Sequence, residues 1–94
     1  MPSYRAILPI GDVHPGHGPE EVMDAAVAAV ACMATVEHTD IQILSGVPQI
    51  VVRFHLVDGD AHNVAAAMHE AVANVATTGP ERLLLRRGGR WVSV

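Results

Sequence analysis

The sequence predicts a single α+β domain, residues 1–94, in which two helices cover one face of an antiparallel sheet. Two observations predict this class. Two alanine- and valine-rich segments match each other when the chain is shifted by 42 residues, as Val22 and Val64 or Ala29 and Ala71 illustrate. Each segment also lies between stretches in which apolar and polar residues alternate, as they do in half-buried strands. A duplicated strand–helix–strand unit folded onto one sheet accounts for both observations.

The first half of the chain is predicted to run strand, loop, helix, strand. Residues 4–10 alternate weakly and form the first strand, and the glycine- and proline-rich residues 11–18 form a loop. Pro19 suits the first position of a helix, which is expected over residues 19–35 because its apolar residues recur at spacings of three and four. A short apolar strand over residues 39–44 completes the unit.

The second half repeats this plan and adds a hairpin. Residues 49–57 form the clearest strand, followed by a helix over residues 61–76 that Gly79-Pro80 ends. Residues 82–87 and 90–94 form a hairpin around the turn at Gly88-Gly89. The residues of the clearest strand that are expected to face the helices are Ile50, Val52, Phe54 and Leu56. Right-handed crossovers place both helices on one face, so we expect a ferredoxin-like βαββαβ sandwich with an extra strand from the C-terminal hairpin.

Charge is sparse in this chain and unevenly distributed. Only 17% of the residues are charged and the net charge is −4, with arginine as the only basic residue besides histidine. An acidic chain is not expected to bind nucleic acid. No apolar run approaches the roughly 20 residues that span a bilayer, and the first residues lack the layout of a signal peptide. We therefore expect a cytoplasmic protein with no membrane association.

The low charge also bears on self-association. A domain of this size buries little of its own surface, so we expect a homodimer or a higher homo-oligomer. The contact is expected on the open face of the sheet, which faces away from the helices and would be too apolar for water. The residues expected on that face are Arg5, Ile7, Val51, Arg53, His55, Val57 and Leu84. Cys32 falls within the first helix and is expected to be a buried, inert thiol.

Two groups of polar residues are candidate ligand-binding sites. Asp12, His14 and His17 lie in the loop before the first helix, where backbone amides can hold an anion. Arg53 and His55 share one face of a strand and are therefore neighbours. Because imidazole and carboxylate also bind zinc, a histidine-based metal protein is an alternative. No fourth ligand occurs at a diagnostic spacing, so no metal and no other cofactor is expected.

An enzyme is the second alternative. If Met1 is removed, Pro2 becomes a secondary amine at the start of the first strand. The N-terminal proline, the duplicated unit and the short length together resemble the tautomerase superfamily. This resemblance implies that Pro2 acts as a base, with Arg5 or Arg53 holding an acid substrate. The main prediction remains a small oligomeric domain that binds a small ligand or a partner protein without catalysis.

Overall fold

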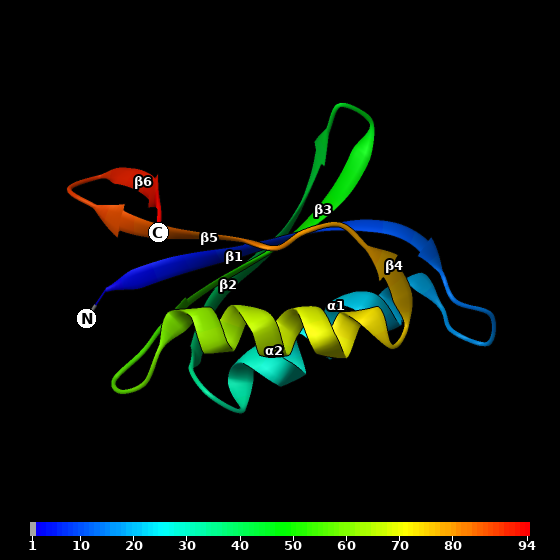
Figure 1. Cartoon of the computed structure of the whole chain (residues 1–94), viewed down its shortest axis with the longest axis horizontal. Helices are drawn as coiled ribbons and strands as arrows, with labels where there is room; N and C mark the ends of the chain where they lie inside the picture. The colour runs from blue at the N-terminus through cyan, green and yellow to red at the C-terminus, as the bar shows by residue number, and fades with distance from the viewer. Residues whose placement is uncertain (1) are drawn as a thin grey trace.

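The structure is a computed structural model that describes residues 2–94 as a six-stranded antiparallel sheet and two helices (Figure 1). The elements, in chain order, are β1 (Ser3–Val13), α1 (Pro19–Ala31), β2 (Thr35–Leu44), β3 (Val47–His55), α2 (Ala61–Ala73), β4 (Ala76–Thr78), β5 (Arg82–Arg87) and β6 (Arg90–Ser93). Both helices lie on one side of the sheet, whereas the tip of the β2–β3 hairpin and the β5–β6 hairpin rise on the other side (Figure 1). The predicted α+β class is confirmed.

The first strand lies at the centre of the sheet. The strand order is β2-β3-β1-β5-β6, and β4 pairs with the far end of β1. β3 pairs with β1 from Ser3 to Pro9, while β5 pairs with it from Tyr4 to Ile7. β4, which the sequence did not predict, pairs with Ile10 and Val13. β4 and β5 are separated by the segment that begins with Gly79 and Pro80, and the Gly79 N–H donates a hydrogen bond to the Pro9 carbonyl.

The two helices repeat each other in position as well as in sequence. Each has 13 residues, and α2 begins 42 positions after α1, which is the shift that aligns the two sequence halves. Both helices end earlier than predicted, with Cys32 and Asn74 as their C-caps. β-branched residues follow each cap within a few positions and favour strands over helix, so β2 begins at Thr35 and β4 at Ala76.

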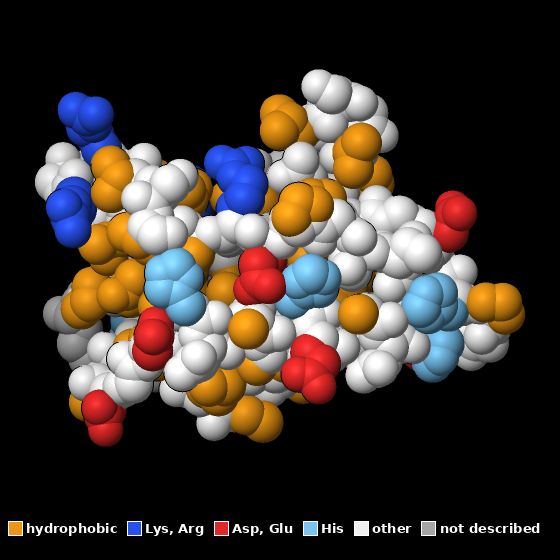
Figure 2. Space-filling model, in the orientation of Figure 1, with side chains coloured by type: hydrophobic (Ala, Val, Ile, Leu, Met, Phe, Trp, Pro, Cys, Tyr) orange, Lys and Arg blue, Asp and Glu red, His pale blue; other side chains and the backbone are white. Residues whose placement is uncertain are grey.

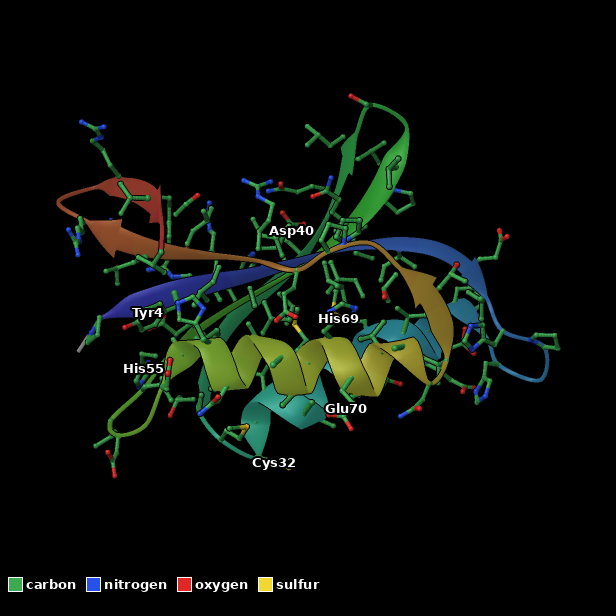
Figure 3. The ribbon with its side chains drawn as sticks, viewed as in Figure 1. Tyr4, Cys32, Asp40, His55, His69 and Glu70 are labelled. Carbon is green, nitrogen blue, oxygen red and sulfur yellow. The ribbon has the colours of Figure 1, made fainter. Side chains whose placement is uncertain are left out.

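The early end of α1 changes the environment of the chain's one cysteine. Cys32 lies just beyond the last helical residue and its side chain is exposed. Figure 3 shows it at the end of α1, away from the sheet. The expectation that this thiol is buried inside the helix is therefore wrong.

The core lies between the helices and the face of the sheet that they cover. Phe54, Leu8 and Met68 are its largest fully buried side chains, and the ring of Tyr4 stacks on Phe54 with 5.6 Å between centroids. All four residues of β3 and its C-terminal extension that were predicted to face the helices are buried: Ile50, Val52, Phe54 and Leu56. Alternation in β3 therefore gave the correct inward face.

The open face of the sheet is less apolar at its surface than expected. Ile7 and Val51 face each other on it, yet they are only 6% and 4% exposed in the single chain. They lie in one row across the strands, with Asp40 beyond Val51 and Arg82 beyond Ile7. Long arginine stems cover apolar neighbours while their charged heads stay in water. The expectation that these two residues leave an uncovered apolar surface is wrong.

Among residues 2–94, most of the exposed large apolar side chains gather elsewhere, at the tip of the β2–β3 hairpin. We call this set the apolar arm, and it comprises Ile41, Ile43, Leu44 and Val47, which are between 42% and 66% exposed. Figure 2 shows hydrophobic side chains at this projecting tip. Within residues 2–94, neither helix has the length and apolarity needed to cross a membrane.

Candidate functional site

The open face of the sheet carries a carboxylate that three side chains surround. Glu37 accepts hydrogen bonds from Arg53 Nε at 2.8 Å and from the Ser3 hydroxyl at 3.0 Å, and it lies 2.9 Å from His55 Nδ1. These side chains come from β2, β3 and β1. The predicted pair of Arg53 and His55 is thus brought together, and the structure adds the shared acidic partner that the sequence did not indicate.

A local irregularity in β2 accounts for the position of Glu37. The register of β2 against β3 shifts between Val36 and His38, so Glu37 has no partner residue in the ladder. An extra residue of this kind bends the strand and redirects its side chain. The Glu37 carboxylate consequently reaches Arg53 and His55 on the open face.

The surroundings of Glu37 favour its ionised form. Partial burial raises the pKa of its carboxyl, but hydrogen bonds from His55, Ser3 and Arg53 and the charge of Arg53 outweigh burial and hold that pKa below its ordinary value. The Glu37, Arg53 and His55 side chains are each less than one-third exposed. The cluster is therefore anchored by an anion at neutral pH.

This lowered pKa predicts how stability depends on pH. A carboxyl whose native pKa is depressed stabilises the fold above its unfolded pKa of about 4.3, and this contribution is lost as pH falls through the native pKa. We expect Glu37→Gln to be less stable than wild type at pH 7, with the difference shrinking between roughly pH 5 and pH 3. Urea unfolding at several pH values measures it. The pKa of Glu21 is also lowered, first by its hydrogen bond with His17, so only the difference between the two proteins reports on Glu37. A constant difference across this range would contradict the prediction.

An aromatic ring lies next to the same cluster. The guanidinium carbon of Arg5 lies 4.2 Å from the centroid of the Trp91 ring, and that of Arg53 lies 5.4 Å from it. Trp91 comes from β6, which the turn at Gly88-Gly89 folds back against β5. Arginine over an indole face is a favourable cation–π contact. Trp91 therefore joins the two arginines across the open face.

The two arginines are also direct neighbours in the sheet. Arg5 on β1 pairs in register with Arg53 on β3. Like charges directly opposite each other in a sheet are destabilising. Glu37 offsets the charge of Arg53, whereas no carboxylate among residues 2–94 lies within ion-pair distance of Arg5. The open-face site, which comprises Ser3, Arg5, Glu37, Arg53, His55 and Trp91, thus contains one cation in excess of its paired acid.

The loop candidates lie far from this site. The loop between β1 and α1 is at one end of the molecule and His55 is at the other (Figures 1 and 3). His14 and His17 each have local partners: His14 donates its backbone N–H to the Val75 carbonyl, and His17 Nδ1 lies 2.6 Å from the Glu21 carboxylate. The backbone carbonyl of Asp12 accepts a hydrogen bond from the Thr77 hydroxyl. These contacts join the loop to α1 and to the segment that follows α2. Asp12 lies in β1 and not in the loop where it was predicted, and its contact is with Thr77 of β4.

The structure therefore does not join the two predicted groups into one site. Among residues 2–94, no three His, Cys, Asp or Glu side chains are arranged to hold a metal ion. Pro2 is exposed next to Ser3 at the start of β1, and its role as a base stays a prediction.

A second histidine network links α2 to the sheet. His69 Nδ1 lies 2.9 Å from the Glu81 carboxylate, and its Nε2 lies 2.8 Å from the Thr78 hydroxyl. This order of groups resembles a nucleophile, base and acid. However, the nearby Gly79 N–H is already bonded to the Pro9 carbonyl, so it is not available to stabilise an oxyanion. The network instead fastens the interrupted β4–β5 segment to α2, which Figure 3 shows directly beneath it.

Three members of the open-face site differ in how far the sequence predicted them. Alternation placed Arg5 on the open face, but a role for it in binding was indicated only through the tautomerase resemblance. Glu37 was missed because the predicted strand began at residue 39, whereas β2 begins at Thr35, and because a bulge directs its side chain to this face. Trp91 was placed on the returning strand of the hairpin, but its reach across β5 to Arg5 depends on tertiary structure.

Comparison with protein-family models, with curated proteins and with solved structures finds no significant match to this chain.

Proposed function

We propose that this chain is a homo-oligomeric binding domain that holds a small carboxylate-bearing ligand on the open face of its sheet, without catalysis. The observation that carries the proposal is the in-register pair of Arg5 and Arg53, both over Trp91, in which Glu37 pairs with Arg53 and Arg5 has no carboxylate partner in the described chain. A ligand carboxylate next to Arg5 would offset the remaining charge. Each of the two arginines on the open face would then have a carboxylate partner when the ligand is bound.

The geometry of arginine supports a carboxylate over other groups. A guanidinium that stacks on an aromatic ring still presents its in-plane N–H groups at the edge, and two of them match the two oxygens of a carboxylate. The partial burial of the neighbouring Arg53 and Glu37 side chains strengthens electrostatic attraction relative to a fully solvated surface. A planar ligand would also gain contact with the indole ring.

We further propose that the architecture is the ferredoxin-like sandwich expected from the sequence, with a fourth strand that is interrupted. The 42-residue shift that superimposes α1 on α2 maps β2 onto residues 77–86. Those residues span parts of β4 and β5, which both pair with β1. If β4 and β5 count as one strand, that strand is the fourth, and the sheet order becomes β4/β5, β1, β3, β2. β6 is then the added hairpin strand.

Trp91 makes the binding proposal directly testable, because it is the only tryptophan in the chain. We expect benzoate and acetate to change the emission of Trp91 in a saturable way, with benzoate binding more tightly because it has an aromatic ring. Arg5→Gln should abolish the saturable change, whereas Arg5→Lys, which keeps the charge but lacks the fork, should weaken binding roughly tenfold.

Arg87→Gln is the matched control for this experiment. Arg87 lies on the β5–β6 hairpin that also carries Trp91, but it is exposed next to the turn. Its replacement should therefore leave the benzoate and acetate titrations unchanged. Benzoate and acetate titrations that show no saturation up to about 10 mM, corresponding to less than roughly 3 kcal/mol of binding, would refute the carboxylate site. If Arg5→Gln and Arg87→Gln lost affinity for benzoate and acetate equally, the binding would be unspecific charge attraction and not a carboxylate site.

A further inference from the structure

Three of the four residues of the apolar arm lie on β2, a strand whose outer edge is unpaired in the described chain. β2 is the first strand in the sheet order and pairs only with β3 in the chain that the structure describes. An open edge of this length offers N–H and C=O groups to another strand. Charged residues and a bulge, which discourage such pairing, are confined to its first half, at Glu37, His38 and Asp40. From Ile41 to Leu44 the edge has no charged side chain. The Ile41 N–H donates a hydrogen bond to the Asp40 carboxylate at 2.8 Å, which a paired strand would replace.

An apolar groove lies beside this uncharged half of the edge. It has a volume of 220 Å³ and runs between the end of β1, the start of α1 and the β2–β3 hairpin. Its lining includes Val13, Val22, Met23, Ile41 and Pro48. The arm therefore projects next to an apolar hollow of the same chain, which it leaves open.

We infer that this surface is the contact between two copies of the chain, formed by antiparallel pairing of their β2 strands about a two-fold axis. This inference rests on the proposed self-association and specifies where it occurs. A two-fold contact uses the same patch on both copies, so each copy must supply both a projection and a place to receive it. The apolar arm and the groove meet this requirement, because β2 pairing lays the exposed Ile41 and Ile43 of each copy along the β2 strand of the other copy, where Ile41 lines the groove.

Charge on β2 is compatible with such pairing and disfavours one register. Pairing centred on Ile41 places Asp40 opposite Gln42 of the second copy. Pairing centred one residue earlier would place two Asp40 carboxylates opposite each other, which is destabilising. A stable interface buries about 800 Å² on each partner, more than one strand edge provides, so filling the groove is a necessary part of the contact.

The test compares a charge in the arm with the same charge elsewhere. Ile43 is 66% exposed and Val57, in the loop after β3, is 85% exposed. We expect Ile43→Glu to raise the dissociation constant of the dimer at least 100-fold in sedimentation equilibrium, whereas Val57→Glu leaves it unchanged. Ile41→Thr/Ile43→Thr, which keeps β-branched side chains and adds no charge, should also weaken the dimer. Far-UV circular dichroism checks that each variant is folded.

Hydrogen exchange distinguishes this contact from other modes of self-association. Amides of residues 39–44 should become more protected as the wild-type concentration rises and should lose that protection in Ile43→Glu. Equal dissociation constants for the wild-type and Ile43→Glu dimers would overturn the β2 contact while leaving self-association intact. Concentration-dependent protection of amides on β1 and β5, in place of residues 39–44, would do the same. A wild type that is monomeric at high micromolar concentration would overturn both. Neither result bears on the Trp91 titration, which reports on the open-face site and not on the edge of β2.

Discussion

Val51→Glu is expected to destabilise the single chain strongly, because it places a charge in the covered centre of the open face. Val51 is only 4% exposed and lies in register with Ile7 on one side and Asp40 on the other. The new carboxylate would have an apolar neighbour and a like charge as its partners. An uncompensated buried charge costs about 3–5 kcal/mol, a large part of the roughly 5–15 kcal/mol that stabilises a typical domain.

Urea unfolding followed by circular dichroism measures this effect, and Val57→Glu is again the matched control. Because Val57 is 85% exposed, its replacement should change the free energy of unfolding by less than about 0.5 kcal/mol. The comparison also guards against a misreading: any loss of self-association in Val51→Glu would reflect unfolding and not an interface at that residue. Equal stabilities of the two variants would show that the centre of the open face is not covered in solution.

Phe54→Ala is expected to have a comparable effect through the core. Phe54 is fully buried between the sheet and the helices, and its ring stacks on Tyr4. Removing a buried phenylalanine side chain costs about 3–5 kcal/mol because the cavity closes only in part. Phe54→Leu keeps most of the volume and should cost less than about 1.5 kcal/mol. Thermal unfolding of the two variants measures both effects. A Phe54→Ala variant within 1 kcal/mol of wild type would contradict the packing described for β3.

The inward face of the sheet was predictable because it depends on local periodicity. Alternation along β3 placed Phe54 and its neighbours under the helices, and Gly88-Gly89 marked the final hairpin. The helix ends were less predictable, since alanine favours helix and therefore gives no signal of where a helix stops. Nothing in the alanine-rich runs marks Cys32 and Asn74 as caps, and the strand β4 was consequently assigned to a helix and a loop.

The open-face site was predictable only in part. Arg53 and His55 could be paired because residues two apart on a strand share a face. Glu37 and Trp91 reach the same place through a bulge and a hairpin, whose effects on direction are not encoded in a two-residue period. The burial of Ile7 and Val51 was likewise not predictable from alternation, which assigns a residue to a face but does not say how far that face is covered. The loop histidines, in contrast, were assigned to one site because they are close in sequence, although His14 contacts the Asn74 carbonyl after α2 and His17 contacts Glu21 on α1.

The central place of β1 has a consequence for how the chain folds. β1 comprises residues 3–13, yet its neighbours on the two sides come from residues 47–55 and from residues 76–87. Contacts this distant in sequence slow folding, because the intervening chain loses entropy before the strands meet. During synthesis β1 must wait for β3, and one of its edges stays unpaired until β4 and β5 are made. The last strands to be synthesised therefore close the sheet around the first.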